Sequence, residues 1–179
     1  MQRIAIVGCS GGGKSTLARA LGARLGLPIV HMDTLFWKPG WTHSDPELFR
    51  LAVEAAAKGE AWIIDGNFIS ASTAHLARAD TVIWLELPRA LCLWRAVWRA
   101  LSAFGAARSD LAPGCPEKID FAFYRYIWNW DRLTRPRMSA ALLVCSSEVC
   151  VIRLGSDQEV AQFLIRMYSP SPTARTSET

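Results

Sequence analysis

The stretch Gly8-Cys9-Ser10-Gly11-Gly12-Gly13-Lys14-Ser15-Thr16 decides how the rest of the sequence is interpreted. It fills the pattern GxxxxGK[ST], which is specific when a strand precedes it and a helix follows it. A short β-branched run, residues 3–8, precedes the stretch, and a helical stripe of leucines begins at Lys14. In such a loop, backbone N–H groups and the N-terminus of the helix bind phosphate. We therefore expect a phosphate-binding loop made by Gly8, Ser10, Gly11, Gly12, Gly13, Lys14, Ser15 and Thr16.

The last residues of this loop predict the nucleotide and the metal. A lysine at the position of Lys14 reaches the β- and γ-phosphates, and a hydroxyl at the position of Ser15 coordinates Mg²⁺. The expected cofactors are therefore ATP and Mg²⁺. We expect Cys9 only to fill a permissive position in the loop.

Strand-like and helix-like segments alternate along the chain. Buried strands are expected at residues 3–8, 28–33, 61–65, 81–87 and 149–154. Helices are expected at residues 14–25, 45–59, 72–78, 89–104, 117–133 and 157–167, with Asp45 as the N-cap of the second. Strands joined by helices form parallel sheets with helices on both faces. The sequence thus predicts an α/β, three-layer P-loop NTPase fold with a five-stranded parallel sheet and a short lid.

The 179 residues suit one domain, expected at residues 1–168 with a lid at about 105–137. The polar, Pro- and Ser-rich residues 169–179 are expected to be disordered. No apolar run is long enough to span a bilayer, and the N-terminus lacks the pattern of a signal peptide, so a cytosolic protein without a membrane partner is expected. The five cysteines include no CxxC pair, which favours reduced thiols over disulfides or zinc.

Two carboxylates follow predicted strands at the edge where parallel sheets bind ligands. Asp65 ends the third strand and is expected to hold Mg²⁺ together with Ser15; capping the turn at Gly66 is the alternative. Asp33 ends the second strand and is expected to orient or deprotonate an acceptor hydroxyl; a turn cap is again the alternative. Trp37 and Trp41 either wall an acceptor pocket or pack in the core.

Basic residues concentrate between positions 89 and 137, which contain nine Arg and Lys but four Asp and Glu. Arg95 and Arg99 are four residues apart and share one face of a predicted helix. We expect Arg95 and Arg99 to contact the nucleotide, with Arg99 neutralising transferred charge; a solvated basic face is the alternative. A second group after the lid consists of Arg125, Arg132, Arg135 and Arg137, and at least one phosphate contact is expected from it. Arg132 and Arg135 are the members expected to take part in catalysis.

The chain resembles the adenylate-kinase-like branch of the P-loop kinases, and within it the bacterial proteins labelled DNA topology modulation protein, FlaR type. The resemblance spans about residues 1–167 and rests on GCSGGGKST, HMDTLFWKPGW, WIIDGNF, LPRALCLWRAVWR, GCPEKIDFAFYRYIW and RLTRPR. It implies a mobile lid over ATP, Arg95 beside the adenine, Arg99 beside phosphate and residues 153–156 behind the adenine. It also implies a place for Asp65-Gly66 near Mg²⁺.

One departure from adenylate kinases bears on the acceptor. Asn67-Phe68 stand where those enzymes have Phe-Pro-x-Arg, whose arginine grips the acceptor nucleotide, so AMP is not the expected acceptor. The region of Asp33 is instead similar to shikimate- and gluconate-type kinases, where such an Asp meets a substrate hydroxyl.

Two hypotheses follow from the sequence. The first is a small kinase that moves the γ-phosphoryl of ATP to a small-molecule acceptor, such as a nucleotide or a sugar acid. The second is a nucleotide-dependent regulator that acts on DNA topology or on a protein partner. No helix-turn-helix, zinc finger or continuous basic face supports direct DNA binding, which favours the kinase. Either protein would be a monomer or a homodimer.

Overall fold

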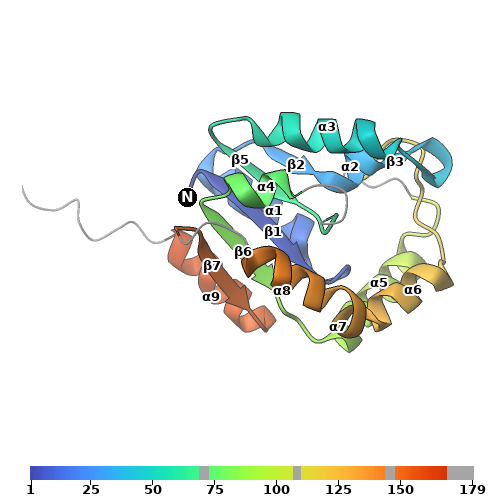
Figure 1. The fold of residues 1–179 in the computed structure, drawn as a ribbon. Helices are drawn as coiled ribbons and strands as arrows, with labels where there is room; N and C mark the ends of the chain where they lie inside the picture. The colour runs from blue at the N-terminus through green and yellow to red at the C-terminus, as the bar shows by residue number, and fades with distance from the viewer. Residues whose placement is uncertain (69–72, 107–109, 144–147, 169–179) are drawn as a thin grey trace, which may run out of the picture.

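The strand that leads into the glycine loop lies in the middle of the sheet. The computed structural model describes residues 1–68, 73–106, 110–143 and 148–168. Five parallel strands pair in the order β2-β5-β1-β6-β7 (Figure 1). Their bounds are Arg3–Gly8 (β1), Ile29–His31 (β2), Trp62–Asp65 (β5), Thr81–Leu85 (β6) and Cys150–Leu154 (β7). The predicted five-stranded parallel sheet is confirmed.

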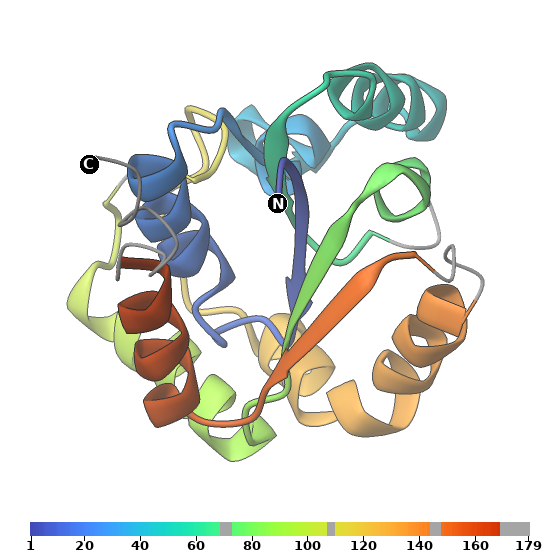
Figure 2. The same cartoon turned by 90° about the vertical axis from the view of Figure 1, so that its left-hand side faces the viewer.

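Helices cover both faces of the sheet because successive residues of its inner strands point to opposite sides. Ala5 and Val7 of β1 pack with α3 (Pro46–Ala57), α4 (Ala74–Arg78) and α8 (Arg135–Leu143). On the other face, Ile4 and Ile6 pack with α1 (Lys14–Leu25) and α9 (Asp157–Tyr168). Figure 2 shows the two helical layers on either side of the sheet. The predicted three-layer fold is confirmed.

The second predicted strand is shorter than expected. It ends at His31, and Asp33 lies in the first turn of a helix, α2 (Met32–Phe36). The chain then forms a small antiparallel hairpin of β3 (Trp37–Lys38), the 3₁₀ turn η1 (Pro39–Trp41) and β4 (Thr42–His43). The prediction that Asp33 ends a strand was therefore wrong, although it directly follows the carboxyl end of β2.

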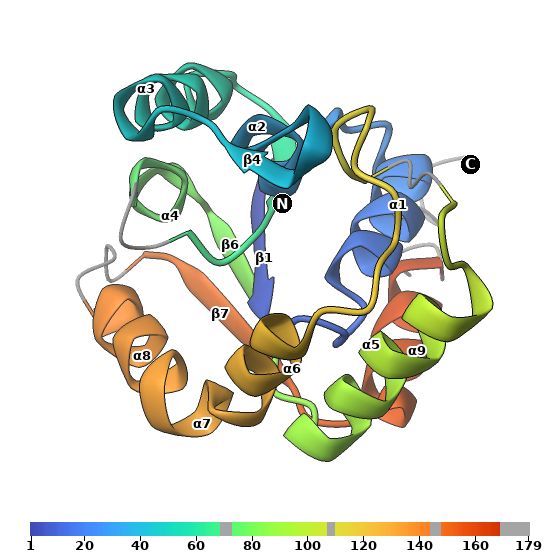
Figure 3. The ribbon, with the colours of Figure 1, turned by 90° about the vertical axis from the view of Figure 1, so that its right-hand side faces the viewer.

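The predicted helix over residues 117–133 is also corrected. Glu117 exchanges two backbone hydrogen bonds with Gly105 and Ala106, both 2.9 Å long, so it cannot begin a helix. Asp120 caps α6 (Phe121–Trp128) by accepting from the N–H of Phe123. A second short helix, α7 (Trp130–Leu133), and the unpredicted α8 follow. In Figure 3, α6 lies beside α5 (Arg89–Ser102), and α7 leads into α8.

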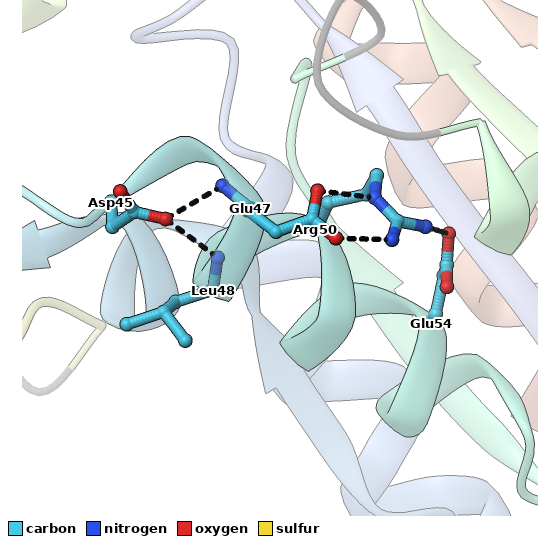
Figure 4. A network of polar contacts seen from close by, with 5 residues as sticks. All are labelled: Asp45, Glu47, Leu48, Arg50 and Glu54. Carbon is cyan, nitrogen blue, oxygen red and sulfur yellow. Dashed lines mark hydrogen bonds and ion pairs between the residues drawn. The ribbon is translucent and has the colours of Figure 1, made fainter.

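The helix after the hairpin shows the predicted capping. One carboxylate oxygen of Asp45 accepts from the N–H groups of Glu47 and Leu48, at 2.9 and 3.1 Å (Figure 4). Arg50 forms ion pairs with Glu47 and Glu54 along the exposed side of α3. This helix therefore has the charged outer face that is typical of a surface helix.

Some sequence predictions fall outside the described residues. The expected disordered tail, residues 169–179, and Cys145 lie there. Among the described residues, Cys9, Cys92, Cys115 and Cys150 are free thiols, as expected. No helix in the described ranges is long and apolar enough to cross a membrane.

Candidate functional site

The glycine loop is pressed against the start of α5. Gly11 has a φ of +86°, and a Cβ added there would lie 2.2 Å from the carbonyl oxygen of Cys92, so only glycine fits. Cys9 is buried, and its hydrogen bond with Cys92 is the main cause that raises the pKa of the Cys9 thiol. Cys9 is thus part of the packing beneath the loop, more than the permissive filler that the sequence suggested.

The end of the loop brings together an amine, a hydroxyl and two strand-end side chains. Lys14 Nζ donates to the carbonyl oxygens of Gly8 and Cys9, at 3.0 and 3.3 Å. Ser15 Oγ donates to Asp65 Oδ2 at 2.8 Å. The carboxylate of Asp65 is 4% exposed, and its other oxygen lies 2.5 Å from His31 Nδ1. A buried carboxylate is thus fixed by a partner on each side.

His31 was given no role by the sequence analysis. Its position follows from the pairing of β2 with β5, which sets His31 opposite Asp65. The hydrogen bond to Asp65 raises the pKa of His31 above its ordinary value, against the opposing effect of burial. His31 therefore helps to hold the Asp65 carboxylate in an orientation in which it can also meet Ser15.

Asn67 ties the loop after β5 to the first residue of the glycine loop. Its Oδ1 accepts from the N–H of Gly8 at 3.0 Å, and its Nδ2 donates to the carbonyl of Gly8 at 2.6 Å. The hydroxyl of Tyr126 on α6 hydrogen-bonds with Asn67 and Thr134, while burial raises the pKa of Tyr126 to about 12. Asn67, which stands where adenylate kinases have a different sequence, therefore holds the start of the glycine loop against the loop after β5.

A cavity of about 1260 Å³ lies over the loop. This is more than the roughly 300–1,000 Å³ of a typical ligand pocket, which leaves room for two ligands. Residues 10–16 of the loop line the cavity, and so do Asp33, Trp37 and Trp41. The structure therefore brings the predicted phosphate-binding and acceptor residues to one cavity, with Asp65 behind Ser15.

The predicted arginines separate into two groups. Arg95 and Arg99 line the cavity, where Arg95 pairs with Asp157 at 2.6 Å and Arg99 with Glu117 at 3.0 Å. Arg132 and Arg135 do not line it, and Arg135 instead pairs with Glu86 at 2.9 Å. Arg137, which the sequence did not single out from its group, is the cavity-lining arginine of α8.

Comparison with known proteins identifies a relative across most of the chain. No protein-family model matches. The uncharacterized protein YqaC of Bacillus subtilis strain 168 is 32% identical over 145 residues, which is 79% of this chain and 79% of that protein. The chain belongs to the YqaC family.

Solved structures show which fold this YqaC-family chain has. A kinase from Chloroflexus aurantiacus, described as putative, matches with a TM-score of 0.56 and 16% identity over 92% of this chain and 95% of that one. A gluconokinase from Sinorhizobium meliloti matches with a TM-score of 0.52, 14% identity and coverages of 93% and 89%. A shikimate kinase from Acinetobacter baumannii in complex with shikimate matches with a TM-score of 0.52, 17% identity and coverages of 94% and 91%. The YqaC-family chain therefore has the fold of small P-loop kinases.

A contact between two distant segments lies at the cavity in this YqaC-family protein, because both segments contribute lining residues. We call it the clasp: residues 114–118 against the hairpin of residues 37–43. Gly40 N–H donates to the carbonyl of Gly114 at 2.8 Å, and the indole N–H of Trp41 donates to the carbonyl of Pro116 at 2.9 Å. The ammonium of Lys118 lies 5.0 Å from the centre of the Trp41 ring. The clasp joins the hairpin to part of the segment that the sequence suggested as a lid.

Proposed function

We propose that this chain is a cytosolic, ATP-dependent phosphotransferase that acts on a hydroxyl-bearing small molecule, such as a sugar acid or a nucleotide. The observation that carries the proposal is the shared cavity: residues 10–16 of the phosphate loop line it together with Asp33, Trp37 and Trp41. Phosphoryl transfer needs donor and acceptor held together out of bulk water, which a cavity of this size can accomplish.

The donor side follows from the loop chemistry. Residues 10–16 would bind the phosphates of ATP through backbone N–H groups, and Lys14 would exchange the carbonyls of Gly8 and Cys9 for phosphate oxygens. The oxygen pair of Ser15 and Asp65, 2.8 Å apart, fits Mg²⁺, which is commonly held by one or two protein oxygens and substrate phosphates. When bound there, the metal would neutralise charge on those phosphates.

Phosphoryl transfer spreads negative charge over the oxygens of the γ-phosphoryl group, which positively charged hydrogen-bond donors stabilise. Arg99 and Arg137 line the cavity and can supply them, and Arg95 lies on the same helix face as Arg99. Arg132 and Arg135 would take part only after a rearrangement of α7 and α8. We therefore favour Arg137 for the role that the sequence analysis gave to Arg132 and Arg135.

The acceptor side is proposed from Asp33. This carboxylate lines the cavity at the carboxyl edge of the sheet, where it can accept the proton of an incoming hydroxyl. The similarity to a gluconokinase and to a shikimate kinase bound to shikimate supports hydroxylated acids as the first acceptors to test.

The decisive experiment measures ADP formation with Mg²⁺ and ATP against a panel of sugar acids, nucleoside monophosphates and nucleosides. One class should accelerate turnover at least tenfold over ATP alone. With that acceptor, Asp33→Asn should lower kcat by about 10²- to 10⁴-fold, the usual worth of a general base, and leave ATP affinity within about twofold. Asp45→Asn is the matched control, because asparagine caps a helix as well as aspartate does. If no acceptor accelerates turnover, or if Asp33→Asn is as active as the control, the proposal fails.

The second candidate is a nucleotide-dependent regulator, as the FlaR-type resemblance suggests. It would require the basic segment to meet DNA phosphates. In the described residues, however, Arg89, Arg95, Arg99 and Arg135 form ion pairs with Asp131, Asp157, Glu117 and Glu86, respectively. Arg89 and Arg135 do not line the cavity and are paired within the chain, whereas Arg95 and Arg99 line the cavity, where a bound phosphate would compete with their carboxylate partners. This division supports the kinase over the regulator. Salt-sensitive DNA binding that persists with ATP bound would reverse this preference.

A further inference from the structure

Helix α5 turns an uncharged face to solvent. Its exposed residues are Ala90, Trp94, Trp98, Leu101 and Ser102. Trp94, Trp98 and Leu101 follow the i, i+4, i+7 spacing that places side chains on one stripe of a helix. These three side chains are 62%, 59% and 59% exposed, and Phe104, just after the helix, is 68% exposed. We call these four residues the α5 stripe.

All three arginines of α5 are directed to other parts of the fold. Arg89 lies over the ring of Trp128 and 3.8 Å from Asp131. Arg95 and Arg99 pair with Asp157 and Glu117 on the cavity side. The charges of this helix are therefore paired within the chain, and the side chains of Arg89, Arg95 and Arg99 are 40%, 35% and 32% exposed, less than the residues of the α5 stripe.

No other long helix in the described part of the chain has such a face. Of the helices with eight or more residues there, α1, α3, α6, α8 and α9 each place a charged residue at an exposed position. Helix α3 is the instructive comparison. Its Leu48 is 65% exposed, but the same helix carries the ion pairs of Arg50 with Glu47 and Glu54 (Figure 4). On α5 the neighbouring exposed side chains are aromatic instead of charged: the rings of Trp94 and Trp98 stack with their centroids 5.9 Å apart.

We propose that a second copy of this chain covers the α5 stripe, with α5 packed on its counterpart across a two-fold axis. The chain carries a net charge of +4, so two copies repel each other least where they meet through a surface without excess positive charge. The α5 stripe is such a surface, and an uncharged apolar face is complementary to itself. An antiparallel arrangement centred near Trp98 would place Trp94 of one copy beside Leu101 of the other, as an isologous interface requires.

The size of the stripe fits a modest dimer. Large apolar side chains bury roughly 150–250 Å² each, so four that are about 60% exposed offer roughly 500 Å² per copy, or about 1,000 Å² in all. This is about the lower bound for a specific interface, so dimerisation is tested over a wide range of protein concentration. Helix α5 lies at the edge of the molecule (Figure 3), and Arg95 and Arg99 line the cavity whereas the four residues of the stripe do not, so a dimer through the stripe leaves the cavity lining uncovered.

Sedimentation velocity of the full chain, from about 1 to 100 µM, tests the proposal with a matched pair of variants. Leu101→Glu places a charge on the stripe and should weaken dimerisation at least tenfold. Leu48→Glu, at a leucine of similar exposure on α3, should leave dimerisation unchanged. Trp98→Ala removes a ring without adding charge and should also weaken the dimer at least tenfold. Far-UV circular dichroism and the midpoint of thermal unfolding report whether each variant is folded.

Several results would overturn the proposal. The wild-type chain could remain a monomer at every concentration, or Leu48→Glu could weaken association as much as Leu101→Glu does. A chain that ends at residue 168 could dimerise where the full chain does not, which would identify residues 169–179 as the cover. Wild-type monomers could instead bind vesicles of anionic lipid through Trp98, which would make the stripe a membrane-binding face.

Discussion

Asn67 fixes the backbone at the start of the phosphate loop. A single amide group binds both the N–H and the carbonyl of Gly8, the point at which β1 turns into the loop. Tyr126 restrains the same amide from α6. Since the loop must be preformed for its N–H groups to converge on phosphate, fixing its first peptide lowers the cost of ordering it upon binding.

Asn67→Ala is therefore expected to weaken ATP·Mg²⁺ binding about tenfold, which corresponds to roughly 1–2 kcal/mol for the two lost hydrogen bonds. Isothermal titration calorimetry measures the change. Asn129→Ala is the control, because Asn129 also bonds a backbone carbonyl, that of Arg125, but does not line the cavity. Equal affinities of the two variants for ATP would refute a role for Asn67 in the loop.

Residue-scale predictions from the sequence succeeded where chemistry is local. Lys14 and Ser15 belong to one continuous pattern, and the structure places both at the cavity. His31 and Asn67 could not be assigned in the same way, because their partners lie 34 and 59 residues away, on Asp65 and Gly8. Only the register of β2 on β5, and the path of the chain after β5, bring these pairs together.

At the scale of elements, the clasp joins two segments that both contribute lining residues to the cavity, Trp37 and Trp41 from one and Glu117 and Lys118 from the other. Gly114 has a φ of +82°, and a Cβ there would lie 2.9 Å from Cβ of Pro39. Gly105 has a similar φ of +75° in the same segment, but no atom lies within 4 Å of an added Cβ. Alanine is thus strained at both positions, and only at Gly114 does it also push the two halves of the clasp apart.

Gly114→Ala should consequently open the clasp, whereas Gly105→Ala should only strain the backbone locally. Amide hydrogen exchange in residues 37–43 and 114–118 should accelerate at least fivefold in Gly114→Ala relative to Gly105→Ala. The exchange of β1 and β6, in the middle of the sheet, should be the same in both. Similar exchange rates in the clasp of the two variants would show that these segments are not held by the contact at Pro39.

Elements were predictable from the sequence in proportion to their length and periodicity. The boundaries of β1 and α1 agree with the expected residues 3–8 and 14–25. The hairpin of residues 37–43 was missed because strands of two residues have no periodicity. The helix expected from residue 117 was wrong at its start because tertiary backbone pairing of Glu117 overrides its local preference.

At the scale of the whole molecule, the helical layer that contains α4 holds a buried histidine that the proposed chemistry does not use. His75 on α4 is 1% exposed, and its Nδ1 has no hydrogen-bond partner among the described residues. Burial lowers the pKa of His75 to about 4. Because an unfolded histidine has a pKa of about 6.5, the unfolded chain binds one more proton than the native chain between these two values.

The free energy of unfolding should therefore decrease by about 3 kcal/mol, from this group alone, as the pH falls from about 6.5 to about 4. Below a pH of about 4 the contribution of His75 should no longer change with pH. His75→Gln should remove this part of the slope, while His43→Gln, at an exposed position of β4, should retain it. Urea unfolding at closely spaced pH values measures the slope, and the difference between the two variants separates His75 from the carboxylates that titrate in the same range. If His75→Gln kept the full wild-type slope, burial would not lower the pKa of His75 by the amount stated, and His75 would not be a determinant of acid stability.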